Sequence, residues 1–280
     1  MYDISSPLIA VILFASLALA IEGGHRIGRK FEPRAGERPK EHINTIQASL
    51  LGVLALLLGF TFSLSLQRYD SRSAAVVEEA NAIGTAYLRA ELLPSSIRDD
   101  VRGLLRDYLD LRIQMGAVTL VNEADRETLL VKANQQLGVL WSLAGRAVEE
   151  VPHPVKTGLF VQALNEMIDA FGKRDAVLNR HVPEVVLFLL YGTFLMTGVI
   201  VGYASGVAGH RASFVAYIMV ALIVVLVFII IDLDRPRRGL IQVSQKSLTD
   251  LQASIEESHG SDSMHPTVDR SSSAAGKVSP

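Results

Sequence analysis

The stretch LLGFTFSLSLQRYDSRSAAVVEEANAIGTAYL, residues 57–88, begins as an apolar membrane segment and continues as a charged one. It contains no proline and no pair of adjacent glycines that would stop a helix. One heptad spacing runs through it from Ser49 to Tyr87, with no change of phase where the charged residues begin. We therefore predict a single helix of about 45 residues, about 70 Å long, that leaves the bilayer and continues beyond it.

The membrane part of this register, which we call the seam, consists mostly of small residues. Its members are Ser49, Gly52, Leu56, Gly59, Ser63, Leu66 and Asp70. In lipid the hydrophobic effect gives helices little reason to associate, and small residues let two backbones approach closely instead. The seam is therefore predicted to contact another helix or to line a pore in an oligomer.

Asp70 carries the only charge in the seam, and it lies where the helix leaves the membrane. An acid there costs free energy unless it is paired or hydrated. One interpretation is an ion pair with a basic residue of the returning helix, among Lys173, Arg174 and Arg180. The other is a ring of Asp70 copies at the mouth of a pore, which would attract cations.

Two polar stripes follow on the same helix. The first is Glu78, Asn81, Thr85 and Arg89, and the second is Arg68, Arg72 and Glu79. Such stripes are typical of the solvated face of an amphipathic helix. A water-filled vestibule lined by Glu78, Asn81 and Thr85 is the alternative.

The composition fits a membrane protein. The chain has 280 residues, 49% of them hydrophobic, and a formal net charge of −2. Without a basic excess or a recognition motif, nothing favours nucleic-acid binding, and the absence of cysteine excludes disulfides and thiolate sites. Four apolar segments, at 7–21, 48–66, 185–208 and 212–231, approach or reach the ~20 residues that a spanning helix needs.

Two features of the membrane topology are less uniform. The small residues ASLALA near position 20 resemble a signal cleavage site, but the basic region that precedes such a site is missing, so we predict an uncleaved first span. The loop at 25–42 is basic, and so are span ends on the opposite side. The positive-inside rule therefore does not decide the orientation.

The remaining regions read as helix. We predict an all-α, multi-pass fold in which residues 67–182 form a four-helix extramembrane region, with breaks at LLPSSIRDD, VNEADRE and VPHP. The expected divisions are 1–44 (first span and basic loop), 45–66 (second span), 67–182, 183–234 (third and fourth spans), 235–257 (short amphipathic helix) and 258–280 (disordered tail).

A second small-residue pattern lies in the third span, in the stretch GVIVGYASG. It places Gly198, Gly202 and Gly206 four residues apart. Two consecutive small-xxx-small steps give a flat groove for another helix, either within the subunit or between subunits.

Motifs for catalysis are missing. The seven histidines show no metal-ligand spacing, and there is no phosphate-binding loop, dinucleotide fingerprint or nucleophile elbow. We therefore expect no enzyme, no cofactor and no metal site. Asp232 and Asp234, in IDLDRPRRG, are expected to pair with the arginines that anchor the helix end at lipid headgroups. Two carboxylates fall short of the six to eight oxygen ligands of calcium.

Three stretches resemble a known family: LLGFTFSLSLQRYDSRSAAVVEEANAIGTAYLRAELLP, YLDLR and DLDRPRRGLIQVSQ. With the four spans in matching order, residues 7–251 resemble the bacterial integral membrane proteins that have a bestrophin-like domain. The resemblance implies a location in the bacterial inner membrane. True bestrophins are pentameric anion channels whose second span lines the neck and whose acidic calcium clasp follows the fourth span.

This sequence departs from that pattern at two places. Its second span has no clear ring of bulky apolar residues, and its acidic segment is much shorter. The resemblance therefore implies neither calcium gating nor anion selectivity here. We predict a homo-oligomeric ion channel or channel-like pore, with the bilayer, its own copies and small inorganic ions as partners. The alternative is a non-conducting membrane sensor or scaffold with a helical-bundle domain.

Overall fold

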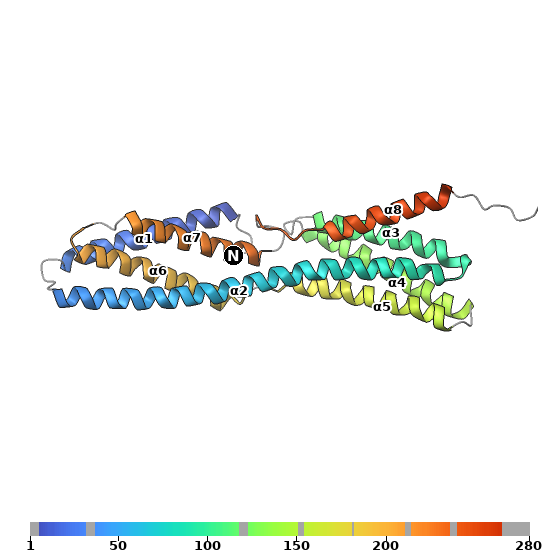
Figure 1. Ribbon diagram of the computed structural model, residues 1–280, viewed down its shortest axis with the longest axis horizontal. Helices are drawn as coiled ribbons and strands as arrows, with labels where there is room; N and C mark the ends of the chain where they lie inside the picture. Colours follow the sequence, from blue (N-terminus) through green and yellow to red (C-terminus); the bar gives the residue numbers. More distant parts are fainter. Residues whose placement is uncertain are drawn as a thin grey trace, which may run out of the picture. The chain divides into compact units, whose positions relative to one another are not determined.

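The computed structural model describes residues 6–31, 37–117, 123–150, 154–180, 182–210, 214–235 and 240–264. Every regular element in these ranges is a helix (Figure 1). They are α1 (Ser6–Phe31), α2 (Glu37–Arg89), η2 (Ala90–Leu92), α3 (Ser95–Ala117), α4 (Glu123–Glu150), α5 (Pro154–Leu178), α6 (Glu184–Val207), α7 (Phe214–Asp234) and α8 (Lys246–Met264). The all-α prediction is confirmed.

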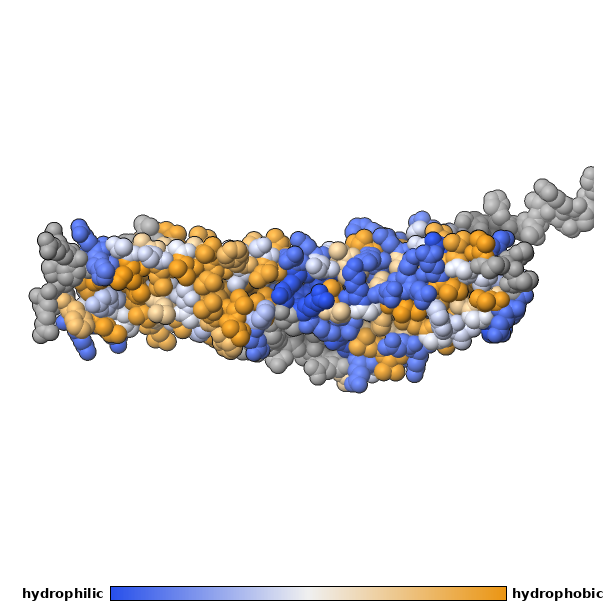
Figure 2. Space-filling model, turned by 90° about the horizontal axis from the view of Figure 1, so that it is seen from below, coloured by the Kyte–Doolittle hydropathy of each residue, from blue (hydrophilic) through white to orange (hydrophobic). Residues whose placement is uncertain are grey.

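Four of these helices are long and apolar enough to cross a membrane, as predicted. The spans are Leu8–Phe31, Glu41–Leu92, Glu184–Val207 and Tyr217–Asp234. Bulky apolar side chains cover much of the outside of these helices, as the orange surface in Figure 2 shows. Phe14, Phe188 and Leu222 are examples, each more than half exposed. Such a surface suits contact with lipid tails.

The chain divides into two compact units. The first comprises Met1–Glu79, Val118–Thr128 and Ile168–Ser244, and the second comprises Ala80–Ala117, Leu129–Met167 and Gln245–Pro280. Helix α2 contributes its first part to one unit and its last part to the other. With 53 residues it is a single helix, as predicted, and longer than expected because it begins at Glu37.

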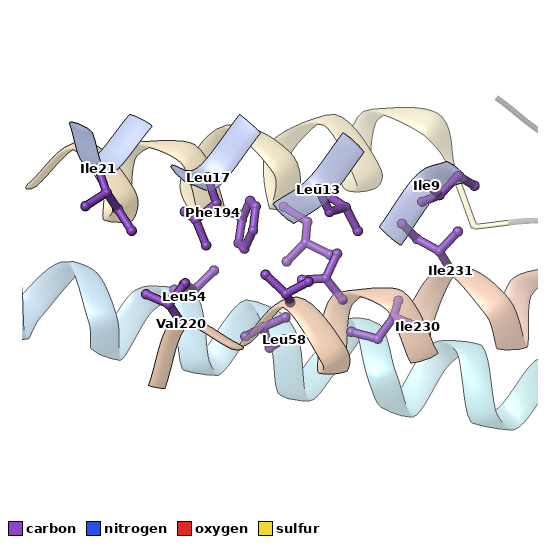
Figure 3. Close-up of a cluster of buried hydrophobic side chains, with 13 residues drawn as sticks. Ile9, Leu13, Leu17, Ile21, Leu54, Leu58, Phe194, Val220, Ile230 and Ile231 are labelled. Atoms are coloured by element: carbon purple, nitrogen blue, oxygen red, sulfur yellow. The ribbon is translucent and has the colours of Figure 1, made fainter. Parts of the chain in front are cut away.

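The core of the first unit is apolar. Leu13 and Leu17 of α1, Leu58 of α2, Phe194 of α6 and Ile230 of α7 belong to one buried cluster (Figure 3). Helix α1 runs ten residues past the predicted end of its apolar segment, so His25, Arg26, Arg29 and Lys30 are helical and do not form a loop. The arginines and lysine of positions 34, 38 and 40 lie outside the residues whose side chains the structure describes.

Glycines allow α1 to pack closely against α6. A Cβ atom on Gly202 would overlap the carbonyl oxygen of Ile21, and one on Gly206 would overlap that of His25. On the α1 side, a Cβ on Gly24 would overlap the carbonyl oxygen of Val199. Backbone contact of this kind explains why α1 remains helical beyond its most apolar part.

In the second unit, α8 packs against α3. Its apolar residues Leu248 and Ile255 are buried, and Leu251 contacts Gly84 of α2. The helix continues to Met264, so the prediction that disorder begins at position 258 is wrong for its first seven residues, and 265–280 lie outside the described residues. Ser258 donates a hydrogen bond to the Ile255 carbonyl (2.8 Å), as expected within a helix.

Candidate functional site

The seam lies on the outer side of α2. All seven of its residues are exposed in the single chain, including Leu56 (59%) and Leu66 (40%). A Cβ atom added to Gly52 or Gly59 would have no neighbour within 4 Å. The seam therefore has no helix of its own chain packed against it in the described structure.

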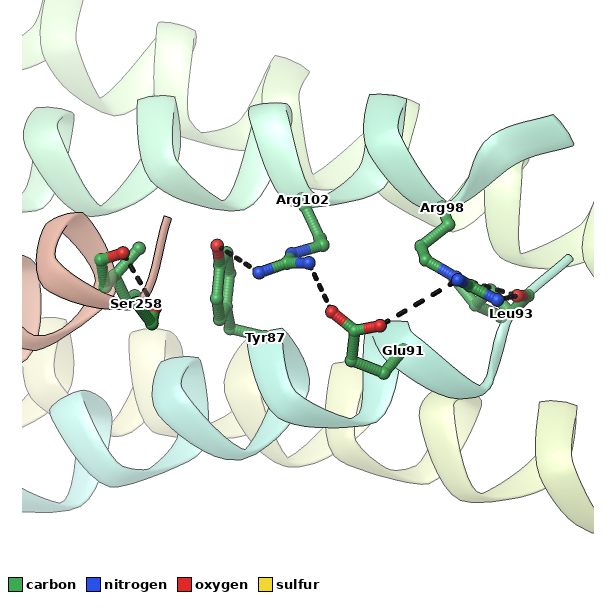
Figure 4. A network of polar contacts seen from close by, with 7 residues as sticks. Tyr87, Glu91, Leu93, Arg98, Arg102 and Ser258 are labelled. Atoms are coloured by element: carbon green, nitrogen blue, oxygen red, sulfur yellow. Dashed lines mark hydrogen bonds and ion pairs between the residues drawn. The ribbon is translucent and has the colours of Figure 1, made fainter. Parts of the chain in front are cut away.

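Beyond the membrane part of α2, residues of the same heptad register become buried. Val77 is 45% exposed, but Ala80 and Tyr87 are buried in the second unit. The Tyr87 hydroxyl accepts a hydrogen bond from Arg102 Nη2 at 2.9 Å, and the Arg102 guanidinium lies 4.7 Å from the Tyr87 ring centroid (Figure 4). Arg102 also pairs with Glu91, which ties α3 to η2, directly after α2.

Asp70 is exposed and has no hydrogen-bond or ion-pair partner among the described residues. Two of its expected partners are taken by other acids. Lys173 Nζ lies 2.6 Å from Glu78 Oε2, and Arg174 pairs with Glu79. The interpretation of Asp70 as an ion pair with the returning helix of its own chain is therefore wrong for the structure of the single chain.

The vestibule residues are divided between the two units. Glu78 is exposed and belongs to the first unit, where it lines a groove beside α2. Asn81 is exposed and Thr85 is half-buried, and both belong to the second unit. The three residues share a helix stripe, as their spacing requires.

The second polar stripe corrects the sequence analysis. Arg68 is half-buried, but Arg72 is 2% exposed and Glu79 is fully buried. The Arg72 guanidinium donates to the carbonyl oxygens of Arg180 (2.9 Å), Leu233 (3.0 Å) and Asp234 (3.2 Å). Carbonyl groups in the last turn of a helix lack helical partners, so Arg72 caps the end of α7 and holds the chain that follows α5.

A buried ion pair lies about two helical turns further along α2. Glu79 accepts a hydrogen bond from Arg174 of α5, and the two side chains are 0% and 2% exposed. Two opposite charges that lose their water together compensate each other, whereas either one alone would be strongly unfavourable. The pair thus fixes α2 against α5 within the first unit.

The two aspartates at the end of α7 bind backbone amides. Both carboxylate oxygens of Asp234 accept from the Val182 amide, at 3.0 and 3.1 Å, and Asp232 accepts from the amides of Leu240 and Ile241. Both side chains are buried. No group of three or more His, Cys, Asp or Glu side chains placed to hold a metal ion occurs among the described residues.

The sequence contained a signal for this buried polar cluster. Leu58, Thr61, Ser65, Arg72, Val76 and Glu79 follow one another at spacings of three, four or seven. The first three are buried with the apolar core, so the same face of the helix carries Arg72 and Glu79 inward. The sequence analysis placed Arg72 and Glu79 on a solvated face because they are charged.

The glycine stripe of α6 is occupied. Gly198, Gly202 and Gly206 are all buried and face Leu17, Ile21 and His25 of α1. Of the two partners that the spacing left open, the partner at these positions is a helix of the same chain.

Comparison with known proteins agrees with this architecture. Residues 13–248 match the model of the Bestrophin-like domain. No curated protein matches the sequence at a significant level.

Solved structures of a bacterial bestrophin homologue from Klebsiella pneumoniae share the fold. A tryptophan-to-alanine variant is 16% identical with a TM-score of 0.69, covering 90% of this chain and 98% of its own. A tyrosine-to-alanine variant is 17% identical with a TM-score of 0.65, covering 89% and 99%. Because the family model spans most of the sequence, the chain belongs to the bestrophin-like family of membrane proteins.

Proposed function

We propose that this protein is a homo-oligomeric ion channel of the bacterial inner membrane, in which the seam of each copy faces a central path. The observation that carries the proposal is the exposure of the whole seam from Ser49 to Asp70 in the single chain. A spanning helix with a face that its own chain leaves open needs another partner for that face.

Lipid is a poor partner for the seam. The lipid-type surfaces of the other spans carry bulky apolar side chains such as Phe14 and Phe188. Leu56 and Leu66 of the seam are of that kind, but its other five residues are serine, glycine and one carboxylate. A carboxylate at the membrane exit costs free energy unless it is paired or hydrated. Contact with further copies, or with water in a path between them, avoids that cost. The resemblance to bestrophins, whose second span lines the neck, supports the same arrangement.

Purified protein in planar bilayers tests the proposal. We expect single-channel currents, and ion substitution identifies the permeant species. Replacing Gly59 by phenylalanine should lower the unitary current several-fold, because a large ring then projects into the path. The matched control is Leu222→Phe on the exposed surface of α7, which should leave the current unchanged.

Two results would count against the channel. Absence of current from the wild-type chain over a range of voltage, calcium concentration and pH favours the non-conducting sensor or scaffold. Equal effects of Gly59→Phe and Leu222→Phe would place the conduction path away from the seam.

A further inference from the structure

A groove of about 640 Å³ lies beside α2 in the first unit. We call it the basic groove. The side chains that matter for its chemistry are Leu64, Arg68, Ser71 and Glu78 of α2, together with Lys173 and Arg180.

The basic groove has an excess of positive charge. Glu78 is its only acid among these residues, and Lys173 pairs with it at 2.6 Å. The guanidinium groups of Arg68 and Arg180 have no hydrogen-bond or ion-pair partner in the described part of the chain. Arg180 is held in place through its backbone, since its carbonyl oxygen accepts from Arg72 Nη2 at 2.9 Å. Two arginines are thus left without a counter-charge at the edge of the groove.

A charge of the opposite sign is available at the same level of α2. Asp70 is exposed and has no partner among the described residues. It lies three residues after Gln67 and four residues before Ala74, and both of these line the groove. Residues three and four apart share one side of a helix, so Asp70 lies at the edge of the groove, where the groove meets the seam.

Rotational symmetry brings these two faces together. In a ring of parallel α2 helices with their seams toward the axis, equivalent residues lie at equal heights, and one edge of each seam faces the side of the next helix. The basic groove adjoins the seam on α2, so it lies on that side. Asp70 of one copy then meets residues near Ser71 and Arg180 of the next.

We propose that the Asp70 carboxylate of each copy pairs with Arg68 and Arg180 in the basic groove of the neighbouring copy. This inference rests on the proposed homo-oligomer, and it names the contact that fixes the register between copies. The pair satisfies three groups that the single chain leaves open. An antiparallel or shifted neighbour would leave them unpaired, so the contact also selects against such arrangements.

The absence of native cysteine makes crosslinking a direct test. One chain with Asp70→Cys and a differently tagged chain with Arg180→Cys are expressed together in membranes and oxidised. We expect a disulfide-linked dimer that carries both tags. Asp70→Cys combined with Arg146→Cys, at an exposed position of α4, is the matched control and should give none.

Charge reversal provides a second test, in which the mass of the oligomer in detergent is measured over a range of protein concentrations. Asp70→Arg and Arg180→Asp, each alone, should raise the protein concentration at which half of the oligomer has dissociated about tenfold. The double variant should restore most of the lost association. The thermal unfolding of each variant shows that the chain itself is folded.

The outcomes separate this inference from the proposed function. A monomeric wild-type chain overturns both. An oligomer that shows neither the mixed crosslink nor the rescue overturns the ion pair alone. Efficient crosslinking between Asp70→Cys copies, with none to Arg180→Cys, places the carboxylates together at the axis and also overturns the pair.

Discussion

Two faces of helix α2 in the first unit differ in whether other parts of the same chain cover them. One face, which includes Thr61, Ser65, Arg72 and Glu79, is buried, and its two charged residues bind other helices of the same chain. The seam, from Ser49 to Asp70, is exposed throughout. Both faces mix polar and small residues, so polarity does not distinguish them. What differs is whether another part of the same chain supplies a counter-charge, a carbonyl group or a helix.

The glycine stripe of α6 extends the comparison. It has the same kind of small-residue spacing as the seam, but α1 fills it with direct backbone contact. Substitutions in a stripe that another helix of the same chain covers should change the unfolding stability of the single chain. Substitutions in the exposed seam should change the association of copies and the ion current.

The largest effect is expected where the closed face of α2 loses a charge. Arg174→Met leaves the fully buried Glu79 without its partner, which should lower the free energy of unfolding by about 3–5 kcal/mol. Lys173→Met is the matched control at the adjacent position. Its partner Glu78 is about half exposed, so the loss should be about 1 kcal/mol or less. Denaturant unfolding in detergent measures both, and equal losses would contradict the distinction.

A smaller effect is expected from Gly202→Ala. The added methyl group meets the carbonyl oxygen of Ile21, and separating α1 from α6 should cost about 1–3 kcal/mol. Gly192→Ala on the same helix meets nothing within 4 Å and should be neutral or stabilising by about 0.5–1 kcal/mol. The difference between their thermal midpoints is the measurement. If the two variants melt together, α1 does not pack on α6 through these glycines.

The smallest effect on the chain itself is expected in the seam. Gly59→Ala adds a methyl group that no atom of its own chain approaches, so the thermal midpoint of the monomer should stay the same or rise slightly. The unitary current in planar bilayers should fall slightly, because the methyl group projects into the path that the seams enclose. Thermal unfolding measures the first quantity, and bilayer recording measures the second. A destabilised monomer would mean that the seam is a closed surface.

Much of the fold could be predicted because it follows from local pattern. The four spans, the helix that continues past Asp70 and the helices α3, α4 and α5 all follow from apolar spacing and from breaks near Pro94 and residues 151–154. Helix α5 ends at Leu178 and α6 begins at Glu184, and Asp234 and Arg72 bind the chain between them.

Less of the candidate site than of the fold could be predicted from the spacing of residues in the sequence. The sequence placed Asp70 at the membrane exit and left two interpretations open, a pair with Lys173, Arg174 or Arg180 and a ring of Asp70 copies. Within the single chain, Lys173 and Arg174 pair with Glu78 and Glu79 instead. The sequence analysis also assigned Arg72 to a solvated stripe. The helical phase that Arg72 shares with Leu58 pointed inward, but a charged side chain in that phase is buried only if distant carbonyl groups receive it.

The sequence by itself determined the number of spans, the continuity of α2 and the existence of two small-residue stripes, because each of these depends on residues close together in the chain. The tertiary structure decided which stripe is closed and which is open. Which stripe is covered depends on where α1, α5 and α7 pack against α2 and α6. These packing contacts join residues far apart in the sequence, and the contact between Arg72 and Leu233 spans more than a hundred positions. Spacing specifies that a helix face needs a partner, and only the arrangement of the whole chain shows whether the partner is already present.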